Sequence, residues 1–441
     1  MSLPLTNRKI NLVQATSINM IDMVGIGPFI VMPFVVAQFN NGLFIWAWIF
    51  GAVTAFADAM IWSELGAKYP LAGGTYNFHR IAFGERGGRF MSFLFVWQTS
   101  IQAPLVMASA SIGFSQHLTY IIHLTDWQQR TISGGLVILV FLLLYRKIET
   151  IGKISVALGS VVVLTILWII ISGLTHRQHS LQLLPSGTES FFSYAFWAAI
   201  GQASVKTVYA YLGYYNVCHL GGEIKNPAKN IPRSIFISIA GIAILYLLMN
   251  ISIMGVIPWQ SINKDDKHLV SSFMEQLYGH QAGIIITGLI LLIAFSSLFA
   301  LVLGYSRVPY AAAVDGNFFR IFAKVHPTKN FPYISLIFLC ALGFVFSLLL
   351  RLDEAIKSIL AIRIIVQFVA QAVGIVLLRK SLGAKDLPFK MWLFPVPVII
   401  SVAIWLFLFI STGWFALWGS LIALAGVCVY FILKSIKENK I

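Results

Sequence analysis

The chain has 441 residues, of which 58% are hydrophobic and only 11% are charged. A water-soluble domain carries roughly a quarter charged residues, so this composition excludes an ordinary soluble domain and indicates a protein that lies in lipid. The formal net charge of +15 would suit a protein that binds nucleic acid, so the placement of the basic residues has to decide its meaning.

Twelve stretches are long and apolar enough to cross a bilayer, which takes about 20 residues because the hydrocarbon core is about 30 Å thick. They cover residues 11–38, 43–67, 89–112, 128–146, 151–173, 191–217, 233–257, 281–312, 332–350, 353–378, 391–410 and 413–434. The first stretch is too long for the apolar part of a signal peptide, so we expect it to remain as a helix. The pattern predicts an all-α membrane protein of about 12 transmembrane helices, with one transmembrane domain over residues 1–441.

The basic residues are distributed unevenly between the two sides of the predicted membrane. If the N-terminus is cytoplasmic, 22 of the 31 Lys and Arg residues fall in cytoplasmic segments, six in the opposite loops and three within or at the ends of helices. The six in the opposite loops are Arg130, Arg177, Lys264, Lys267, Arg351 and Lys357. This positive-inside bias explains the net charge without nucleic acid, and it predicts a multi-pass protein of the cell (inner or plasma) membrane with both termini cytoplasmic.

Two of the stretches are interrupted near their middle. The first contains Asp22 followed by Gly25-Ile26-Gly27-Pro28, and the sixth contains Gly213. In hydrocarbon every backbone polar group needs a partner, so a helix broken by Gly or Pro needs a reason. Interrupted helices five spans apart indicate an inverted-repeat transporter with a binding site near the membrane midplane. The two halves share no residue-level identity, so the repeat is inferred from the breaks alone.

A broken helix offers partners to both charged groups of an α-amino acid. Free amides at Ile26 and Gly27 would bind the carboxylate, and free carbonyls at Met23 and Val24 would bind the ammonium. Gly25 lets the backbone turn and the ligand approach. The alternative is that the two glycines form a close-packing seam between helices and that the following proline is a simple kink.

At these residues the sequence resembles the amino acid-polyamine-organocation superfamily, and within it the L-type amino acid transporter branch. The resemblance covers nearly the whole chain and rests on several motifs taken together. They are Gly25-Ile26-Gly27, Tyr69-Pro70, Gly73-Gly74-Thr75-Tyr76, Gly152-Lys153, Gly213 to Asn216, Glu223-Ile224-Lys225-Asn226-Pro227, Ile231-Pro232-Arg233, Tyr305-Ser306-Arg307 and Asp315-Gly316.

The resemblance implies a LeuT-like fold with a 5+5 inverted repeat, in which helices 1 and 6 are discontinuous. The repeats would cover residues 10–174 and 191–379, with two peripheral helices over residues 390–435. It also implies uptake or exchange of amino acids, and it adds the carbonyls of Tyr209 and Leu212, beside Gly213, to the ammonium site.

Aromatic residues beside the second break suggest a gate. Tyr209 or Tyr211 could close over a bound side chain and exclude water, and the resemblance favours Tyr209 as the lid. Because 14% of the chain is aromatic, both residues could instead be ordinary core or interfacial aromatics.

Two acids could take part in specificity or coupling. Asp22 could recognise a cationic or hydroxyl side chain, take up a proton, or pair with Lys206 or Arg363. Glu223 could relay protons together with His219, or it could anchor the adjoining basic loop.

Lys153 opens the fifth predicted helix. Its position resembles the L-type branch, where an ammonium in place of a bound cation would make transport independent of sodium. The alternative is a lysine at a helix end that extends to the membrane interface.

The sequence therefore predicts a secondary active transporter of amino acids, a permease or an exchanger, that works by alternating access. A polyamine or other organic cation carrier of the same fold is the alternative, favoured by Asp22 and the tyrosines. A channel would show a lined pore or filter repeat, and an enzyme would need clustered His, Asp or Cys, so neither class is favoured. We expect no cofactor, no metal and no catalytic residue. The choice of amino acid, proton coupling, oligomeric state and any accessory subunit stay open.

Overall fold

A computed structural model describes residues 8–39, 42–145, 148–181, 183–184, 191–264, 266–382 and 387–438 of the chain. The side chains of residues 148–153, 382 and 436–438 lie outside this description. The described residues form helices and two isolated β-bridges, with no strand among them. The predicted all-α class is therefore confirmed.

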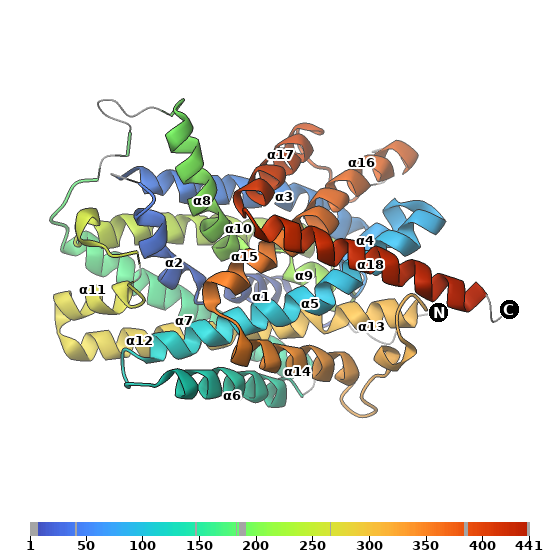
Figure 1. The fold of residues 1–441 in the computed structure, drawn as a ribbon, viewed down its shortest axis with the longest axis horizontal. Helices are drawn as coiled ribbons and strands as arrows, with labels where there is room; N and C mark the ends of the chain where they lie inside the picture. Colours follow the sequence, from blue (N-terminus) through green and yellow to red (C-terminus); the bar gives the residue numbers. More distant parts are fainter. Residues whose placement is uncertain are drawn as a thin grey trace.

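The helices run in the order expected from the apolar stretches (Figure 1). In the first half of the chain they are α1 (Leu12–Met23), α2 (Gly27–Val36), α3 (Ile45–Lys68), α4 (Thr75–Ala82), α5 (Gly84–Leu118), α6 (Asp126–Leu144) and α7 (Ile148–Thr175). In the second half they are α8 (Tyr194–Tyr211), α9 (Asn216–His219), α10 (Pro227–Met254), α11 (Leu269–Tyr278), α12 (His280–Tyr305), α13 (Arg307–Val314), α14 (Tyr333–Leu349), α15 (Leu352–Arg363), α16 (Ala370–Leu382), α17 (Val396–Ser411) and α18 (Phe415–Glu438).

Eight of the described helical segments are long and apolar enough to cross a membrane, or nine if α1 and α2 form one bent span. Two further apolar helices, α14 and α17, are shorter. The chain therefore has the helices of a multi-pass membrane protein. All twelve predicted stretches lie on helices, but the number of twelve spans stays a prediction.

Two short helices lie in segments that the sequence did not predict to be helical. One is α4, which follows α3, and the other is α11, which lies in the long connection before α12. Both are strongly amphipathic and too short to span a bilayer, so an apolar-stretch criterion does not find them.

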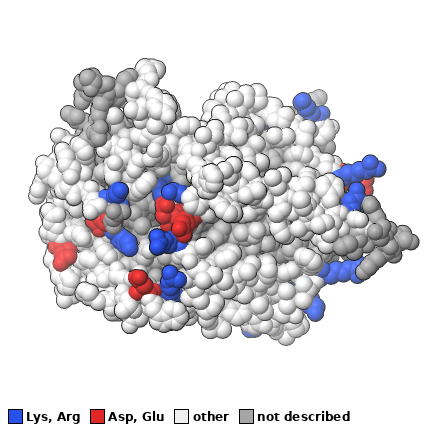
Figure 2. Space-filling model, viewed as in Figure 1, with Lys and Arg blue, Asp and Glu red and all other residues white. Residues whose placement is uncertain are grey.

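The start of α1 and the end of α18 lie at the same end of the molecule (Figure 1). Most of the Lys and Arg side chains visible outside the central hollow gather at that end (Figure 2). This arrangement agrees with the predicted positive-inside topology, and the cytoplasmic location of the termini stays a prediction.

The first span is interrupted where the sequence predicts it. A capping box between Asn11 and Gln14 starts α1, which ends at Met23. Residues 24–26 are not helical, and α2 then begins at Gly27 with a proline in its first turn, where a missing N–H costs no hydrogen bond. The two helices are bent by 44° at this break.

The second interruption lies on the other side of the same space. Helix α8 ends at Tyr211, residues 212–215 form turns, and α9 begins at Asn216. Helix α1 packs against α7, α9, α10 and α12, while α2 packs against α8 and α5. The halves of the two broken helices therefore pack together at the centre of the molecule.

Candidate functional site

The two breaks touch at Gly213. This residue has a φ of 124°, a conformation that side-chain-bearing residues rarely adopt. A Cβ atom added here would lie 2.7 Å from the carbonyl carbon of Asp22 and 2.7 Å from the nitrogen of Met23. Glycine is thus required both by the turn and by the close approach of the α1 backbone.

Tyr246 of α10 joins the two breaks through their carbonyl groups. Its hydroxyl lies 3.0 Å from the carbonyl oxygen of Met23 and 3.1 Å from that of Ala210, and it can donate to either. Both oxygens lie in the last turn of a helix, α1 or α8, where carbonyl oxygens have no hydrogen-bond donor within their own helix. Sequence reasoning missed Tyr246, because a tyrosine inside an apolar helix gives no sign of what it faces.

A small cavity of about 40 Å³ lies between the breaks. This volume holds about three water molecules, so an amino acid could enter only if the lining side chains moved apart. The lining residues are Asp22, Met23, Gly25, Ile26, Gly27, Val106, Ala110, Tyr209, Ala210, Leu212, Gly213, Tyr215, Ser297, Leu301, Tyr305 and Arg363. Of the predicted substrate-binding residues, only Val24 is outside this lining.

Backbone amides are available at the start of α2. In the described part of the chain, no oxygen accepts a hydrogen bond from the N–H group of Gly25, Ile26 or Gly27. Buried amides without partners cost free energy unless a ligand or water binds them. The positive end of the α2 dipole points the same way, so this wall of the cavity favours a negative group.

The cavity also contains one acid and one base within the membrane-spanning region. Asp22 lies in the last turn of α1 and is 9% exposed, and Arg363 is the last residue of α15 and is 2% exposed. They interact electrostatically, but they form no ion pair within 4.0 Å. Lys206, the other predicted partner of Asp22, contacts Asp353 instead. The sequence predicted Arg363 only as a structural partner of Asp22. It did not predict that Arg363 lines the cavity.

Tyr209 covers the cavity on the side of α2. Its hydroxyl lies 2.8 Å from the hydroxyl of Ser109 on α5. A Cβ atom at Gly27 would lie 3.3 Å from the Tyr209 ring, so the ring rests on the start of α2. Tyr211 points elsewhere, packing against Trp48 and Tyr246 outside the cavity lining.

A much wider cavity of about 740 Å³ is lined by residues about one helical turn from the small cavity, namely Ile30 of α2, Ile112 of α5 and Lys206 of α8. It is lined by parts of the same helices, α2, α5, α8 and α15. Its charged lining residues are Asp126, Arg130, Lys206, Lys264, Asp266, Lys267, Arg351, Asp353 and Lys357. Figure 2 shows basic and acidic side chains gathered in a hollow of an otherwise uncharged face. We call this cavity the vestibule.

The end that carries the termini is closed by polar contacts. The segment before α1 pairs with the segment after α9, since the N–H of Ile10 donates to the carbonyl of Glu223 (3.0 Å) and the N–H of Lys225 donates to the carbonyl of Ile10 (2.8 Å). The carboxylate of Glu223 accepts from Nε of Arg307 at 3.1 Å, and both side chains are 4% exposed. Glu223 therefore lies outside the small cavity, in a buried ion pair.

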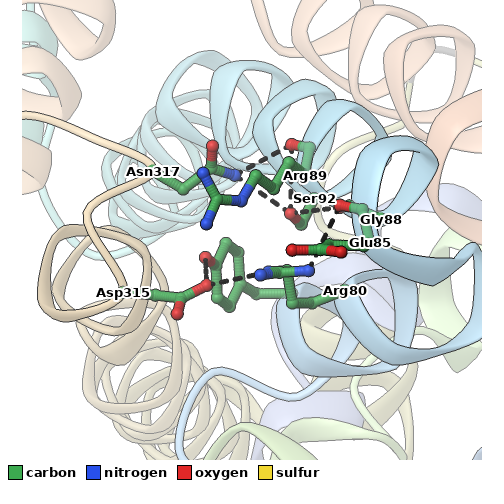
Figure 3. Close-up of polar contacts among 8 residues, drawn as sticks. Arg80, Glu85, Gly88, Arg89, Ser92, Asp315 and Asn317 are labelled. Carbon is green, nitrogen blue, oxygen red and sulfur yellow. Dashed lines mark hydrogen bonds and ion pairs between the residues drawn. The ribbon is translucent and has the colours of Figure 1, made fainter.

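A second polar network joins α4 and α5 to the end of α13 (Figure 3). Asp315 accepts from the hydroxyl of Tyr76 at 2.7 Å and from Nε of Arg80 at 3.1 Å. Asn317 donates to the carbonyl of Arg89 at 2.9 Å and to the hydroxyl of Ser92 at 3.0 Å. With the vestibule open at the opposite end, access to the small cavity is closed at this end.

Helix α7 includes Lys153, but the side chain of this residue lies outside the described part of the chain. Its predicted role therefore stays a prediction.

Apolar helices that span a membrane, two of them broken around a small buried cavity, form the architecture of a membrane transport protein. The chain matches the family model for amino acid permeases over residues 10–433, and it belongs to that family. This assignment confirms the predicted membership of the amino acid-polyamine-organocation superfamily, and it confirms a transporter rather than an enzyme.

Several relatives in Bacillus subtilis are similar over nearly their whole length. The uncharacterized amino acid permease YecA is 24% identical, covering 98% of this chain and 97% of the relative. The branched-chain amino acid permease BcaP is 27% identical, covering 95% of this chain and 91% of the relative. The serine/threonine exchanger SteT is 26% identical, covering 98% of both.

Proposed function

We propose that the chain is a secondary active transporter that moves amino acids across the cell membrane by alternating access, independently of sodium. The single observation that carries this proposal is the set of three partnerless amides at Gly25, Ile26 and Gly27, which face a cavity that also contains the carboxylate of Asp22. Amides and carboxylate together complement the two charges common to all α-amino acids.

The same proposal includes the 5+5 repeat, with residues 10–174 and 191–379 as the two halves and residues 390–435 as peripheral helices. It is supported by the two breaks, which pack together although they lie nearly 200 residues apart in the sequence. It is also supported by the vestibule, since alternating access requires one open and one closed path to a central site.

The carboxylate would bind the amides of Ile26 and Gly27, and the ammonium would lie near Asp22 and the carbonyl groups of Met23, Tyr209 and Leu212 at the ends of the broken helices. Tyr209 would act as the lid between this site and the vestibule. A polyamine carrier is less well supported, because Arg363 and a basic vestibule face the path that a cation would take.

Purified protein in proteoliposomes provides the test. We expect saturable uptake of a labelled amino acid that is accelerated by unlabelled amino acid on the other side. Gly27→Leu would press on the Tyr209 ring and fill the space beside the amides, so it should abolish uptake without preventing membrane insertion. The proposal fails if putrescine rather than any amino acid is taken up, or if Gly27→Leu transports with unchanged affinity.

A further inference from the structure

The strongest unexplained feature of the small cavity is the guanidinium group of Arg363. Nε donates to the side-chain oxygen of Gln367 at 3.1 Å, and Nη2 donates to the hydroxyls of Tyr305 (2.7 Å) and Tyr215. The group also lies 5.3 Å from the centre of the Phe368 ring. All these partners are neutral, and they fix the orientation of the guanidinium plane.

No described carboxylate lies within 4.0 Å of this guanidinium, although the residue is almost completely buried. Its third nitrogen, Nη1, donates to no described residue. A charge buried in the membrane is costly unless it is paired, and one that faces a cavity marks a functional position. An anion placed in the cavity would supply the missing partner, because the N–H groups of Nη1 can form charge-assisted hydrogen bonds to a carboxylate.

The charges that line the vestibule also favour an anion. Six basic side chains and only three acidic ones line it. Five of these six are basic residues of the loops that the positive-inside rule should keep poor in Lys and Arg. Asp353 pairs with Lys206 and with Lys357 at 2.8 Å, so these three side chains together keep one positive charge, and the whole lining has an excess of three positive charges. A concave surface with this excess attracts anions and repels cations.

We propose that the substrate carries a second carboxylate, that is, an acidic amino acid of the glutamate or aspartate type. This inference rests on the proposed function, because the amides of α2 must first hold the α-carboxylate. The α-ammonium then lies by Asp22, and the side-chain carboxylate binds Arg363 through Nη1. Tyr215 and Tyr305 keep the guanidinium in place, so they act as positioning residues.

The role of the charged vestibule can be tested by the salt dependence of uptake. The screening length falls from about 30 Å at 0.01 M salt to about 8 Å at 0.15 M, so attraction by the basic lining must weaken over this range. In proteoliposomes, kcat/KM for glutamate should fall at least about threefold as salt is raised with an inert electrolyte, while kcat/KM for glutamine changes less. Equal salt dependence of the two substrates would overturn the role of the vestibule.

The decisive comparison is between glutamate and glutamine, and between aspartate and asparagine, which differ only in the side-chain charge. The wild-type protein should favour the acid by at least about tenfold in kcat/KM, the ratio expected when one buried charge loses its partner. In Arg363→Gln this ratio should fall to about one or below. The exposed Arg177, which lines neither cavity, gives the matched control Arg177→Gln, whose ratio should equal that of the wild type.

If Arg363→Gln does not reach the membrane, Arg363→Lys carries the test, since it keeps the charge but loses the planar guanidinium that Gln367, Tyr215 and Tyr305 orient, and its ratio should still fall. Wild-type protein that prefers glutamine or another neutral amino acid overturns the inference and leaves amino acid transport standing. An unchanged ratio in the Arg363 variants also overturns it. Failure of every amino acid in the panel refutes the proposed function itself.

Discussion

The hydroxyl group of Tyr209 lies 2.8 Å from the hydroxyl group of Ser109. This contact joins α8 to α5 at the level where the small cavity adjoins the vestibule, and it holds the ring against the start of α2. The proposed lid would therefore open and close at little cost in free energy, since a neutral hydrogen bond contributes about 1 kcal/mol net.

Tyr209→Phe keeps the ring and removes this hydrogen bond. We expect faster release of preloaded labelled substrate from proteoliposomes, by about fivefold, because about 1 kcal/mol of closure is lost. Ser109→Ala should have the same effect, and the double variant should add nothing further. Ser111→Ala, two residues further along α5, is the control, because the Ser111 hydroxyl donates to the Ala108 carbonyl of its own helix. Independent, additive effects of the two variants would place the lid elsewhere.

Gly213→Ala tests whether the contact between the breaks is essential. The added methyl group would lie 2.7 Å from the backbone of α1, at a φ of 124° that alanine adopts poorly. We expect a loss of thermal stability in detergent together with loss of substrate binding, at a cost of about 1–3 kcal/mol from the backbone conformation alone.

Gly288 of α12 is the matched control for this variant. It is exposed, and a Cβ atom there would meet nothing within 4 Å. Gly288→Ala should leave uptake unchanged and should slightly raise the melting temperature, because alanine is favoured inside helices. Normal substrate affinity in Gly213→Ala would show that the two breaks need not touch.

The sequence predicted the breaks more reliably than the side chains around them. Gly25, Gly27, Pro28 and Gly213 act through the backbone, and their effect is local, so the pattern alone reveals it. Tyr209 and Tyr211 show the limit of this approach. Residues two apart on a helix point about 200° away from each other, and only the packing of α3 and α10 decides which ring reaches the cavity.

The same limit applies to Arg363 and Tyr246, whose contacts come from distant parts of the sequence. The pattern marks Arg363 as a charge in an apolar helix, which is a signal of function, but it cannot say whether Asp22 pairs with it or merely shares its cavity. The extent of α5 was underestimated for a different reason. Polar residues at both ends of Gly84–Leu118 lowered the local hydropathy, although the helix continues through them.

Glu223→Gln separates the two predicted roles of this acid. The carboxylate is buried against Arg307, so its loss leaves an unpaired buried charge and should destabilise the protein by about 3–5 kcal/mol. We expect a lower melting temperature in detergent, restored in part when Arg307 is also replaced by Gln. Glu85→Gln, at an exposed position, should change little. If Glu223 instead relayed protons, the variant would keep its stability and lose the pH dependence of uptake.

Sodium independence is the last prediction, and it concerns the region around Lys153. Helix α7 packs against α1, and a Cβ atom at Gly159 would lie 3.1 Å from Cβ of Ser17. Lys153 precedes Gly159 by six residues, or about 9 Å along α7, while the break in α1 lies about 9 Å beyond Ser17 in the other direction. The predicted role of Lys153, in place of a cation or at the membrane interface, therefore has to be decided by experiment.

We expect uptake to persist when sodium is replaced by choline, because the proposed site uses backbone amides, Asp22 and Arg363 and includes no cation. Lys153→Ala then distinguishes the two roles of the lysine in the same assay. A fall of at least about tenfold with normal insertion would assign it to the transport cycle, whereas nearly unchanged uptake would assign it to the interface. Lys324→Ala, on the segment after α13, controls for the loss of one basic residue at the same end. Strict dependence of uptake on sodium would refute the prediction.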